Sequence, residues 1–184
     1  MKIAVGITGA SGCFLGFKLA YEISKNHETY VVISESAKTT LKLENGINFN
    51  EEKQKLQKAT ILDDKDIGAC VASGSFGIQK TIIAPCSINT LAKISNGFCD
   101  TLITRMAAVA LKEQKRLVLG VREMPFSNIS LKQMSELSSL NVMIAPPVFG
   151  FYSKSQSFDD ICDFIVGKWL DTLEIENSLY KRWN

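Results

Sequence analysis

The sequence predicts a doubly wound α/β fold, in which helices cover both faces of a mainly parallel β-sheet. Short apolar, β-branched runs alternate along the chain with longer segments of helical periodicity. Most of these runs are apolar at successive positions, which is typical of strands buried on both faces. The length of 184 residues is typical of one domain, so we expect a single domain over residues 1–184.

The first half of the chain begins with an apolar strand at 2–7, and a helical stripe follows from Phe14 to about Lys25. The run TYVVIS at 29–34 predicts a second strand, and 37–43 a short helix. Residues 45–66 are polar and have no clean period, so we expect a surface loop there with a weak strand at 60–62.

The remaining elements continue the same alternation. Residues 81–84 form an apolar strand that we expect Pro85 to end, and helical patterns follow at 88–96 and 101–114. RLVLGV at 116–121 predicts a strand, 130–139 a helix, and 142–145 a strand. The last helix has apolar residues at i, i+3, i+4 and i+7 spacing, namely Phe158, Ile161, Cys162, Ile165, Trp169 and Leu173. This order of elements is typical of Rossmann-like and flavodoxin-like folds.

Composition excludes several classes of function. Lys plus Arg is 21 and Asp plus Glu is 19, so a net charge of +2 gives no electrostatic case for a nucleic acid or a membrane as the main partner. His27 is the single histidine, which excludes two-His zinc sites, and the five cysteines form no C-x-x-C pair. We therefore expect no metal site. An odd number of cysteines and no recognisable signal peptide predict reduced thiols and a cytoplasmic protein.

In a doubly wound sheet, ligands bind beyond the carboxyl ends of the strands. Gly9-Ala10-Ser11-Gly12 follows the first strand, and its glycines permit a tight turn at a helix N-terminus that can hold a phosphate. Ser87, Ile88, Asn89 and Thr90 follow the strand at 81–84 in the same way. An ordinary helix cap is the alternative in both places, and neither loop matches G-x-G-x-x-G or the P-loop pattern.

A group of ionic residues gives a third candidate. Arg105 and Lys112 are seven residues apart on one predicted helix, and Arg122 and Glu123 directly follow the strand at 116–121. Basic residues on a helix are usually solvated. An Arg beside a Glu at the end of a buried strand, however, can bind an anion while the carboxylate moves a proton.

Together these motifs resemble the UbiX-like flavin prenyltransferases. The matching motifs run in order over essentially the whole chain, as GITGASG (6–12), ASGS (72–75), PCSxNT (85–90), AxVALKE (107–113), VREMPFS (121–127) and GFY (150–152). Arg182-Trp183 near the C-terminus fits too. The resemblance implies a metal-independent transferase that joins a dimethylallyl group from dimethylallyl monophosphate to reduced FMN, first at N5 and then at C6. It also implies that the product, prenylated FMN, serves UbiD-type decarboxylases of quinone or aromatic-acid pathways, and that the chain assembles as a homo-oligomer, a dodecamer in the family.

The resemblance also implies residue roles. The positions that match family FMN contacts are Gly9, Ala10, Ser11, Ser34, Ser87, Ile88, Asn89, Thr90 and Arg122. Tyr152 and Lys168 match prenyl-phosphate contacts, and Arg105 and Lys112 are similar in role. Glu44 and Glu123 match acidic residues that handle protons, and we count Ser11 and Lys112 with them as candidate catalytic residues.

The chemistry of the reaction agrees with these residue types. Breaking an allylic C–O bond without a metal requires protein cations at the leaving phosphate, and ring closure at C6 requires a base such as Glu123. No step requires an imidazole. Three positions depart from the family pattern: Lys168, where some members carry Arg, Ile67, where some carry an aromatic, and Lys154-Ser155. These departures affect the expected details of substrate binding.

Two other functions are considered. An FMN-dependent decarboxylase of peptidyl cysteine or phosphopantothenoylcysteine would share the fold, but it relies on an active-site histidine, and His27 is expected in an exposed turn at the opposite end of the sheet. The second alternative is a non-enzymatic FMN-binding accessory subunit of a decarboxylase. This alternative gives no function to the cations at 105, 112, 122 and 168.

Overall fold

A computed structural model describes residues 1–183. Six parallel strands form one sheet in the order β3-β2-β1-β4-β5-β6. The strands are β1 (Lys2–Ile7), β2 (Glu28–Ile33), β3 (Ala59–Asp63), β4 (Lys80–Cys86), β5 (Arg116–Val121) and β6 (Met143–Ile144). This order confirms the predicted doubly wound fold. The chain moves outward from β1 to β3 and then returns to β4, so the order of the strands reverses between β1 and β4.

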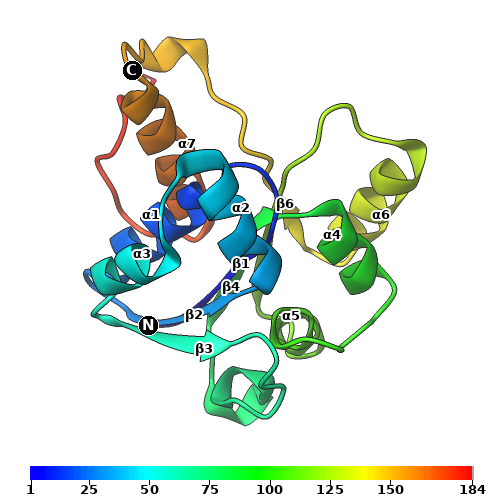
Figure 1. Cartoon of the computed structure of the whole chain (residues 1–184). Helices are drawn as coiled ribbons and strands as arrows, with labels where there is room; N and C mark the ends of the chain where they lie inside the picture. The colour runs from blue at the N-terminus through cyan, green and yellow to red at the C-terminus, as the bar shows by residue number, and fades with distance from the viewer. Residues whose placement is uncertain (184) are drawn as a thin grey trace.

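Helices cover both faces of the sheet (Figure 1). The α-helices are α1 (Phe14–Ser24), α2 (Glu35–Asn45), α3 (Phe49–Lys55), α4 (Ile88–Ser95), α5 (Leu102–Lys112), α6 (Asn128–Ser139) and α7 (Phe158–Thr172). Short 3-10 turns lie at Cys70–Ala72, Gly74–Phe76 and Phe151–Ser153. Helices α1 and α7 pack with α3 on one face, and α4, α5 and α6 lie on the other.

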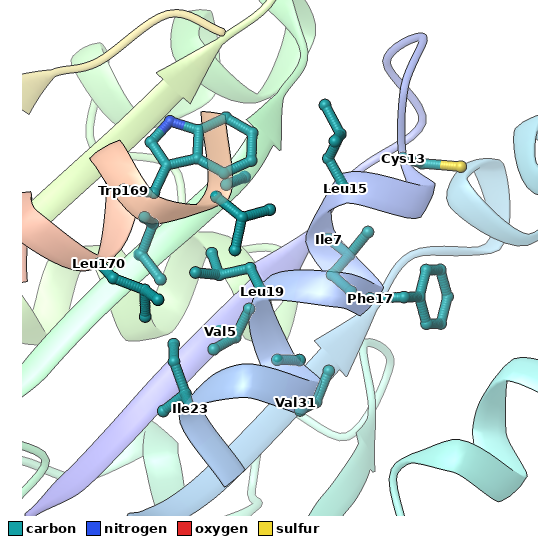
Figure 2. Packing of buried hydrophobic residues seen from close by; sticks show 14 of the residues in the cluster. Val5, Ile7, Cys13, Leu15, Phe17, Leu19, Ile23, Val31, Trp169 and Leu170 are labelled. Atoms are coloured by element: carbon teal, nitrogen blue, oxygen red, sulfur yellow. The ribbon is translucent and has the colours of Figure 1, made fainter. Parts of the chain in front are cut away.

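Side chains alternate between two cores along each central strand. In β1, Ile3, Val5 and Ile7 face α1 and α7, whereas Ala4 faces α5. Both sets are fully buried, which explains why the strands read as continuous apolar runs. Figure 2 shows the first core, in which Trp169 and Leu170 of α7 lie with Leu19 and Ile23 of α1 over β1.

The segment at 45–66 corrects a sequence expectation. The predicted loop contains the helix α3, and the weak strand is β3, fully paired with β2. Asn48 caps α3, because its side chain accepts a hydrogen bond from Asn50 N at 2.9 Å. Between Asn48 and Leu56, only Phe49 and Leu56 place apolar side chains against the core; of the charged residues between these two, Glu52 is buried and the others are exposed. Two apolar anchors are too few to give a visible helical period.

Strand β4 also differs from expectation, because it continues through Pro85 to Cys86. The pairing with β5 shifts register between Ile83 and Cys86, and this irregularity accommodates a residue that has no N–H. Helix α6 begins two residues early at Asn128, capped by Ser127, and β6 is shorter than predicted.

His27 lies in the turn between α1 and β2, at the amino edge of the sheet, as predicted, but it is partly buried. Burial is the main cause that lowers the pKa of its imidazole, and the N-terminus and Lys80 add to the effect. All five cysteines are free thiols. No helix within residues 1–183 is long and apolar enough to cross a bilayer.

Gly16 permits the close contact between α1 and the sheet. A Cβ at this position would lie 2.3 Å from the carbonyl oxygen of Ala84 in β4. We therefore expect Gly16→Ala to lower the free energy of unfolding by about 1–3 kcal/mol through overpacking. Urea unfolding checks this. Gly68→Ala is the control, since a Cβ there meets only an ordinary contact at 3.5 Å. Equal unfolding midpoints for the two variants would contradict the prediction.

Candidate active site

A cavity of about 400 Å³ lies at the carboxyl edge of the sheet, where the strand order reverses. Proteins commonly bind small ligands in cavities of roughly 300–1,000 Å³ at such switch points. Hydroxyl, amide and ionic side chains dominate its lining, including Thr8, Ser34, Ser36, Asp64, Ser87, Asn89, Thr90, Lys93, Asp100 and Thr101. Of the residues predicted from sequence, Ser34, Ser87, Asn89 and Thr90 are therefore brought together here.

Thr8 joins the ends of the two central strands. Its hydroxyl donates to the carbonyl oxygen of Pro85 at 2.8 Å and accepts from Ser87 N at 2.8 Å. The side chain is buried at 2% exposure, and it also lines the cavity. Thr8 thus fixes the loop after β1 against the loop after β4. Sequence reasoning included Thr8 in a candidate loop but assigned it no role.

We expect Thr8→Val to remove both hydrogen bonds and leave Ser87 N without its partner. The predicted loss is about 1–3 kcal/mol of unfolding free energy, because an unpaired buried donor costs its full desolvation. Binding of FMN, the ligand that the sequence resemblance implies, should also weaken, because the loop after β4 is no longer fixed to the loop after β1. Thermal unfolding and flavin titration measure the two effects. Thr8→Ser keeps the hydroxyl and serves as the matched control. A valine variant that binds flavin as tightly as the serine variant would remove Thr8 from this role.

Helices α2, α4 and α5 begin at the cavity, and a serine caps α2 and α4. Ser34 Oγ accepts from Ala37 N at 3.2 Å in α2, and Ser87 Oγ accepts from Thr90 N at 3.2 Å in α4. The Ser87 and Thr90 hydroxyls also share a hydrogen bond at 3.0 Å. The N–H groups of Ile88 and Asn89, in the first turn of α4, have no partner within the helix and can bind an anion. The helix-cap and ligand interpretations of this loop are therefore compatible.

The turn at 9–12 lies beside α2. A Cβ at Gly9 would lie 2.5 Å from Ser36 Cβ, so only glycine allows this approach to a residue that lines the cavity. Gly12 N donates to Glu44 Oε2 at 2.9 Å, which places Glu44 at the turn that contains Ala10 and Ser11. The structure thus places Gly9 against a residue that lines the cavity, whereas Glu44 lies at the far end of α2 and contacts Gly12 rather than the cavity.

Acidic groups occupy the side of the cavity at the N-terminus of α5. Asp64 Oδ1 accepts from Ile103 N at 2.9 Å, and the Asp64 carbonyl accepts from Leu102 N at 2.8 Å. Burial raises the pKa of Asp64, although the bond from Ile103 opposes the shift. Lys93 donates to Asp100 at 2.5 Å, and this hydrogen bond is the main cause that lowers the pKa of Asp100. Since Asp64 already satisfies the start of α5, α4 and α2 remain the better places for a phosphate.

Arg122 and Glu123 leave the sheet at the same edge. Arg122 N donates to the carbonyl oxygen of Cys86 at 3.0 Å, which holds the end of β5 beside the loop that begins with Ser87. Both side chains are exposed, and Glu123 Oε1 accepts a hydrogen bond from Met124 N at 3.0 Å. They are free to contact a ligand held over the strand ends.

Tyr152 and Lys168 lie outside this cavity, on the α7 side of the sheet. Lys168 borders a hollow of about 310 Å³ that is mainly apolar, with Phe149, Phe164 and Trp169 in its lining. Tyr152 packs edge-on against Phe164, with ring centroids 5.6 Å apart. An apolar hollow with a cation beside it suits a small apolar group that carries an anion.

The structure does not bring Arg105 and Lys112 to these residues within one chain. Arg105 Nε donates to the carbonyl oxygen of Ala72 at 3.2 Å and so holds the ASGS segment against α5. Lys112 ends α5 near the amino edge of the sheet and forms an ion pair with Glu113. Within one chain Arg105 and Lys112 are therefore engaged elsewhere, and their role at the prenyl phosphate stays a prediction. For Lys112 the reason is that α5 runs antiparallel to the strands and carries this residue about 15 Å from the start of the helix.

A larger hollow of about 680 Å³ lies between α1 and the α3 region. Its lining is aromatic and aliphatic, with a rim of lysines that includes Lys18 and Lys25, which are paired with Asp163 and Glu22. It lies beside the helices rather than at the strand ends. We therefore place the site at the smaller cavity, where helix N-termini and hydroxyl groups converge.

A parallel sheet with strand order 3-2-1-4-5-6 and capped helix N-termini around a hydroxyl-lined cavity is typical of nucleotide-binding α/β proteins. Comparison with known proteins agrees, because the Flavoprotein family model matches residues 1–170. The chain belongs to the family of UbiX flavin prenyltransferases, which are transferases. It is 52% identical to flavin prenyltransferase UbiX of Campylobacter jejuni subsp. jejuni serotype O:2, over 100% of this chain and 98% of that protein. It is 45% identical to the UbiX of Thermoplasma acidophilum, with both chains fully covered.

Solved structures of other proteins have the same fold as this chain. A crystal structure of AnUbiX (PadA1) in complex with FMN and dimethylallyl pyrophosphate has a TM-score of 0.95 at 40% identity, and covers 100% of this chain and 97% of that one. A dodecameric FMN-dependent UbiX-like decarboxylase from Escherichia coli O157:H7 has a TM-score of 0.94 at 39% identity, with both chains fully covered. A PPC decarboxylase mutant shares the fold alone, with a TM-score of 0.65 at 20% identity over 80% of this chain and 82% of that one.

Proposed function

We propose that this protein transfers a dimethylallyl group from dimethylallyl monophosphate to reduced FMN and releases prenylated FMN. The observation that carries the proposal is a pair of chemically different hollows, one at the carboxyl edge of the sheet and the other beside α7. One is hydroxyl-lined with free helix amides, and the other is apolar with Lys168 beside it. The first suits a flavin mononucleotide, and the second suits an allylic phosphate. The family relatives and the neighbour bound to FMN and dimethylallyl pyrophosphate support this pairing.

The residues of the first site fit FMN. Ser34, Ser87 and Thr90 offer hydroxyls, and the turn at Gly9 and Ser11 allows the backbone to approach the ligand closely. Arg122 lies over the end of β5, where it can contact the flavin ring or its phosphate. Bound FMN supplies an electron-rich ring that can be alkylated when it is reduced. The chain supplies position, charge and proton transfer.

The second substrate requires cations at its leaving phosphate. Arg122, Lys168 and the Tyr152 hydroxyl are the candidates from one chain, and they replace a metal ion in this proposal. Lys112 and Arg105 can contribute only from another copy, since within a chain they lie elsewhere. We therefore propose that the enzyme works as a homo-oligomer, which the dodecameric neighbour supports. We further propose one catalytic domain, action in the cytosol, and a UbiD-type decarboxylase as recipient of the product.

An anaerobic assay tests this function. Purified protein is mixed with reduced FMN and dimethylallyl monophosphate, and the flavin is analysed by chromatography and mass spectrometry. We expect the flavin to gain one dimethylallyl group in place of a hydrogen, at a rate unchanged by EDTA. A flavin of unchanged mass would overturn the proposal, and inhibition by EDTA would contradict the metal-free part. Cysteine-peptide decarboxylation, assayed in parallel, is the expected activity under the alternative.

A further inference from the structure

The chain after α7 folds back along that helix and ends beside the loop that carries Tyr152 (Figure 1). We call residues 174–183 the C-terminal strap. At the start of the strap, Lys80 and Arg116 hold Glu174 at 2.9 and 2.6 Å, beside the C-terminus of α7. At its other end, the Trp183 ring lies edge-on to Tyr152, with centroids 5.5 Å apart. The strap therefore connects the far end of α7 to the candidate prenyl-phosphate site.

Asp171 in the last turn of α7 accepts hydrogen bonds from several residues of this strap. Its carboxylate accepts two hydrogen bonds from Arg182, at 2.8 and 3.1 Å, and one from Asn177 at 2.9 Å. It also accepts a hydrogen bond from the Tyr180 hydroxyl. Burial opposes the charge of Asp171, but these hydrogen bonds prevail and lower its pKa. Burial and the bond to Asp171 raise the pKa of Tyr180 to about 12, so its hydroxyl stays a donor.

Aromatic contacts connect the anchored strap to Tyr152. Tyr180 packs on Phe164 with centroids 4.9 Å apart, and Phe164 packs on Tyr152 at 5.6 Å. Gly167 makes room for Tyr180, because a Cβ there would lie 2.5 Å from the Tyr180 ring. Tyr152 thus contacts Phe164, which packs on Tyr180 of the strap, and Trp183, which belongs to the strap.

The same network leaves Lys168 free for a ligand. Lys168 Nζ is 4.0 Å from Asp171, whereas Arg182 is 2.8 Å from the same carboxylate in a two-bond arrangement. Arg182 therefore neutralises Asp171 more closely than Lys168 does. The ammonium group, on a half-exposed side chain, keeps its charge available to an anion.

We propose that Asp171 is a positioning residue for the prenyl-phosphate site: by anchoring the strap through Arg182, Tyr180 and Asn177, it fixes Tyr152. The inference rests on the proposed function. If Asp171 only stabilised the fold, its loss would lower the melting temperature and affect both substrates alike. A positioning role predicts an effect on one substrate.

The test compares Asp171→Asn with two other variants in steady-state assays at saturating reduced FMN. We expect Asp171→Asn to raise KM for dimethylallyl monophosphate at least about tenfold, with kcat and FMN affinity within about twofold, since binding groups lose preorganisation. Asp171→Glu should restore most of the affinity. Asp163→Asn is the matched control, because Asp163 lies on the same helix and pairs with Lys18 of α1 at 2.8 Å, away from the strap. A KM no higher than that of the control, or an equal loss of FMN binding, would overturn the inference.

A second measurement does not depend on turnover. Trypsin cleavage after Arg182, followed by intact mass, reports how firmly the strap holds that side chain. We expect Asp171→Asn to be cleaved at least about tenfold faster than the wild type or Asp163→Asn, since an undocked terminus is readily cleaved. Equal cleavage rates would overturn the anchoring role. A folded wild type that makes no product would instead overturn the proposed function, whatever the proteolysis shows, so the two failures are distinguishable.

Discussion

Glu123→Gln is expected to lower the rate of prenylated FMN formation by about 10²–10⁴-fold, the usual contribution of a positioned acid or base. Glutamine keeps the size of the side chain and can still accept the hydrogen bond that Met124 N donates at 3.0 Å. It cannot take up the proton that leaves when the ring closes at C6. Flavin that carries the dimethylallyl group through one bond should therefore accumulate. It has the same mass as the closed product, so chromatography and absorption spectra must separate them.

The control for this variant is Glu136→Gln, because Glu136 is an exposed carboxylate of α6. It should turn over at the wild-type rate. Binding of FMN and of the prenyl donor should stay within about twofold in both variants, since neither removes a charge-pairing partner shown in the structure. Wild-type turnover by Glu123→Gln would exclude the proton-transfer role.

Lys168→Met is expected to produce the second large effect. Methionine retains much of the apolar stem that borders the hollow with Phe149 and Phe164, but it removes the cation next to the proposed phosphate. Removing one preorganised group that stabilises developing charge typically costs about 10²–10³ in kcat. We expect a loss of this size in single-turnover transfer of the dimethylallyl group, with FMN affinity unchanged.

Lys168→Arg tests whether a positive charge at this position is sufficient for activity. It should retain activity, because arginine keeps the charge and adds a two-pronged donor for phosphate. Lys132→Met, on the exposed face of α6, controls for the loss of a surface charge. If Lys168→Met reacts as fast as Lys132→Met, the leaving phosphate is stabilised by other groups.

The central fold follows from local sequence to a large extent. Strands such as Ile3–Ile7 and Leu117–Val121 are apolar on both faces because helices cover both, and this pattern is visible in the residues themselves. Residues 49–55 gave no such signal, because α3 rests on the core through Phe49 and Leu56 and exposes most of its other side chains. The continuation of β4 through Pro85 was also invisible, since it depends on an irregular register with β5.

The candidate site likewise contains residues that the sequence predicted and residues that it did not. Ser34, Ser87 and Thr90 were predictable because a short polar side chain directly after a buried strand is a local feature. Thr8 was missed although it also follows a strand directly, and that position was a usable signal. Asp171 gave no signal in the sequence, because its partners Arg182, Tyr180 and Asn177 contact it only when the strap folds back along α7. The resemblance to UbiX-like enzymes identified the family that the comparisons confirm.

The sequence by itself determined the order of strands and helices apart from α3, the loops that carry polar groups and the family, since these depend on periodicity and on motifs within a few residues. The tertiary structure alone decided which groups meet. It placed Thr8 between two strands, separated Lys112 from Arg122 and Lys168 within one chain, and connected Asp171 to Tyr152 through the strap. The physical reason is the direction of the helices. Because α5 and α7 run antiparallel to the strands, a residue late in either helix lies far from the carboxyl ends of the strands, and this separation cannot be read from the sequence alone.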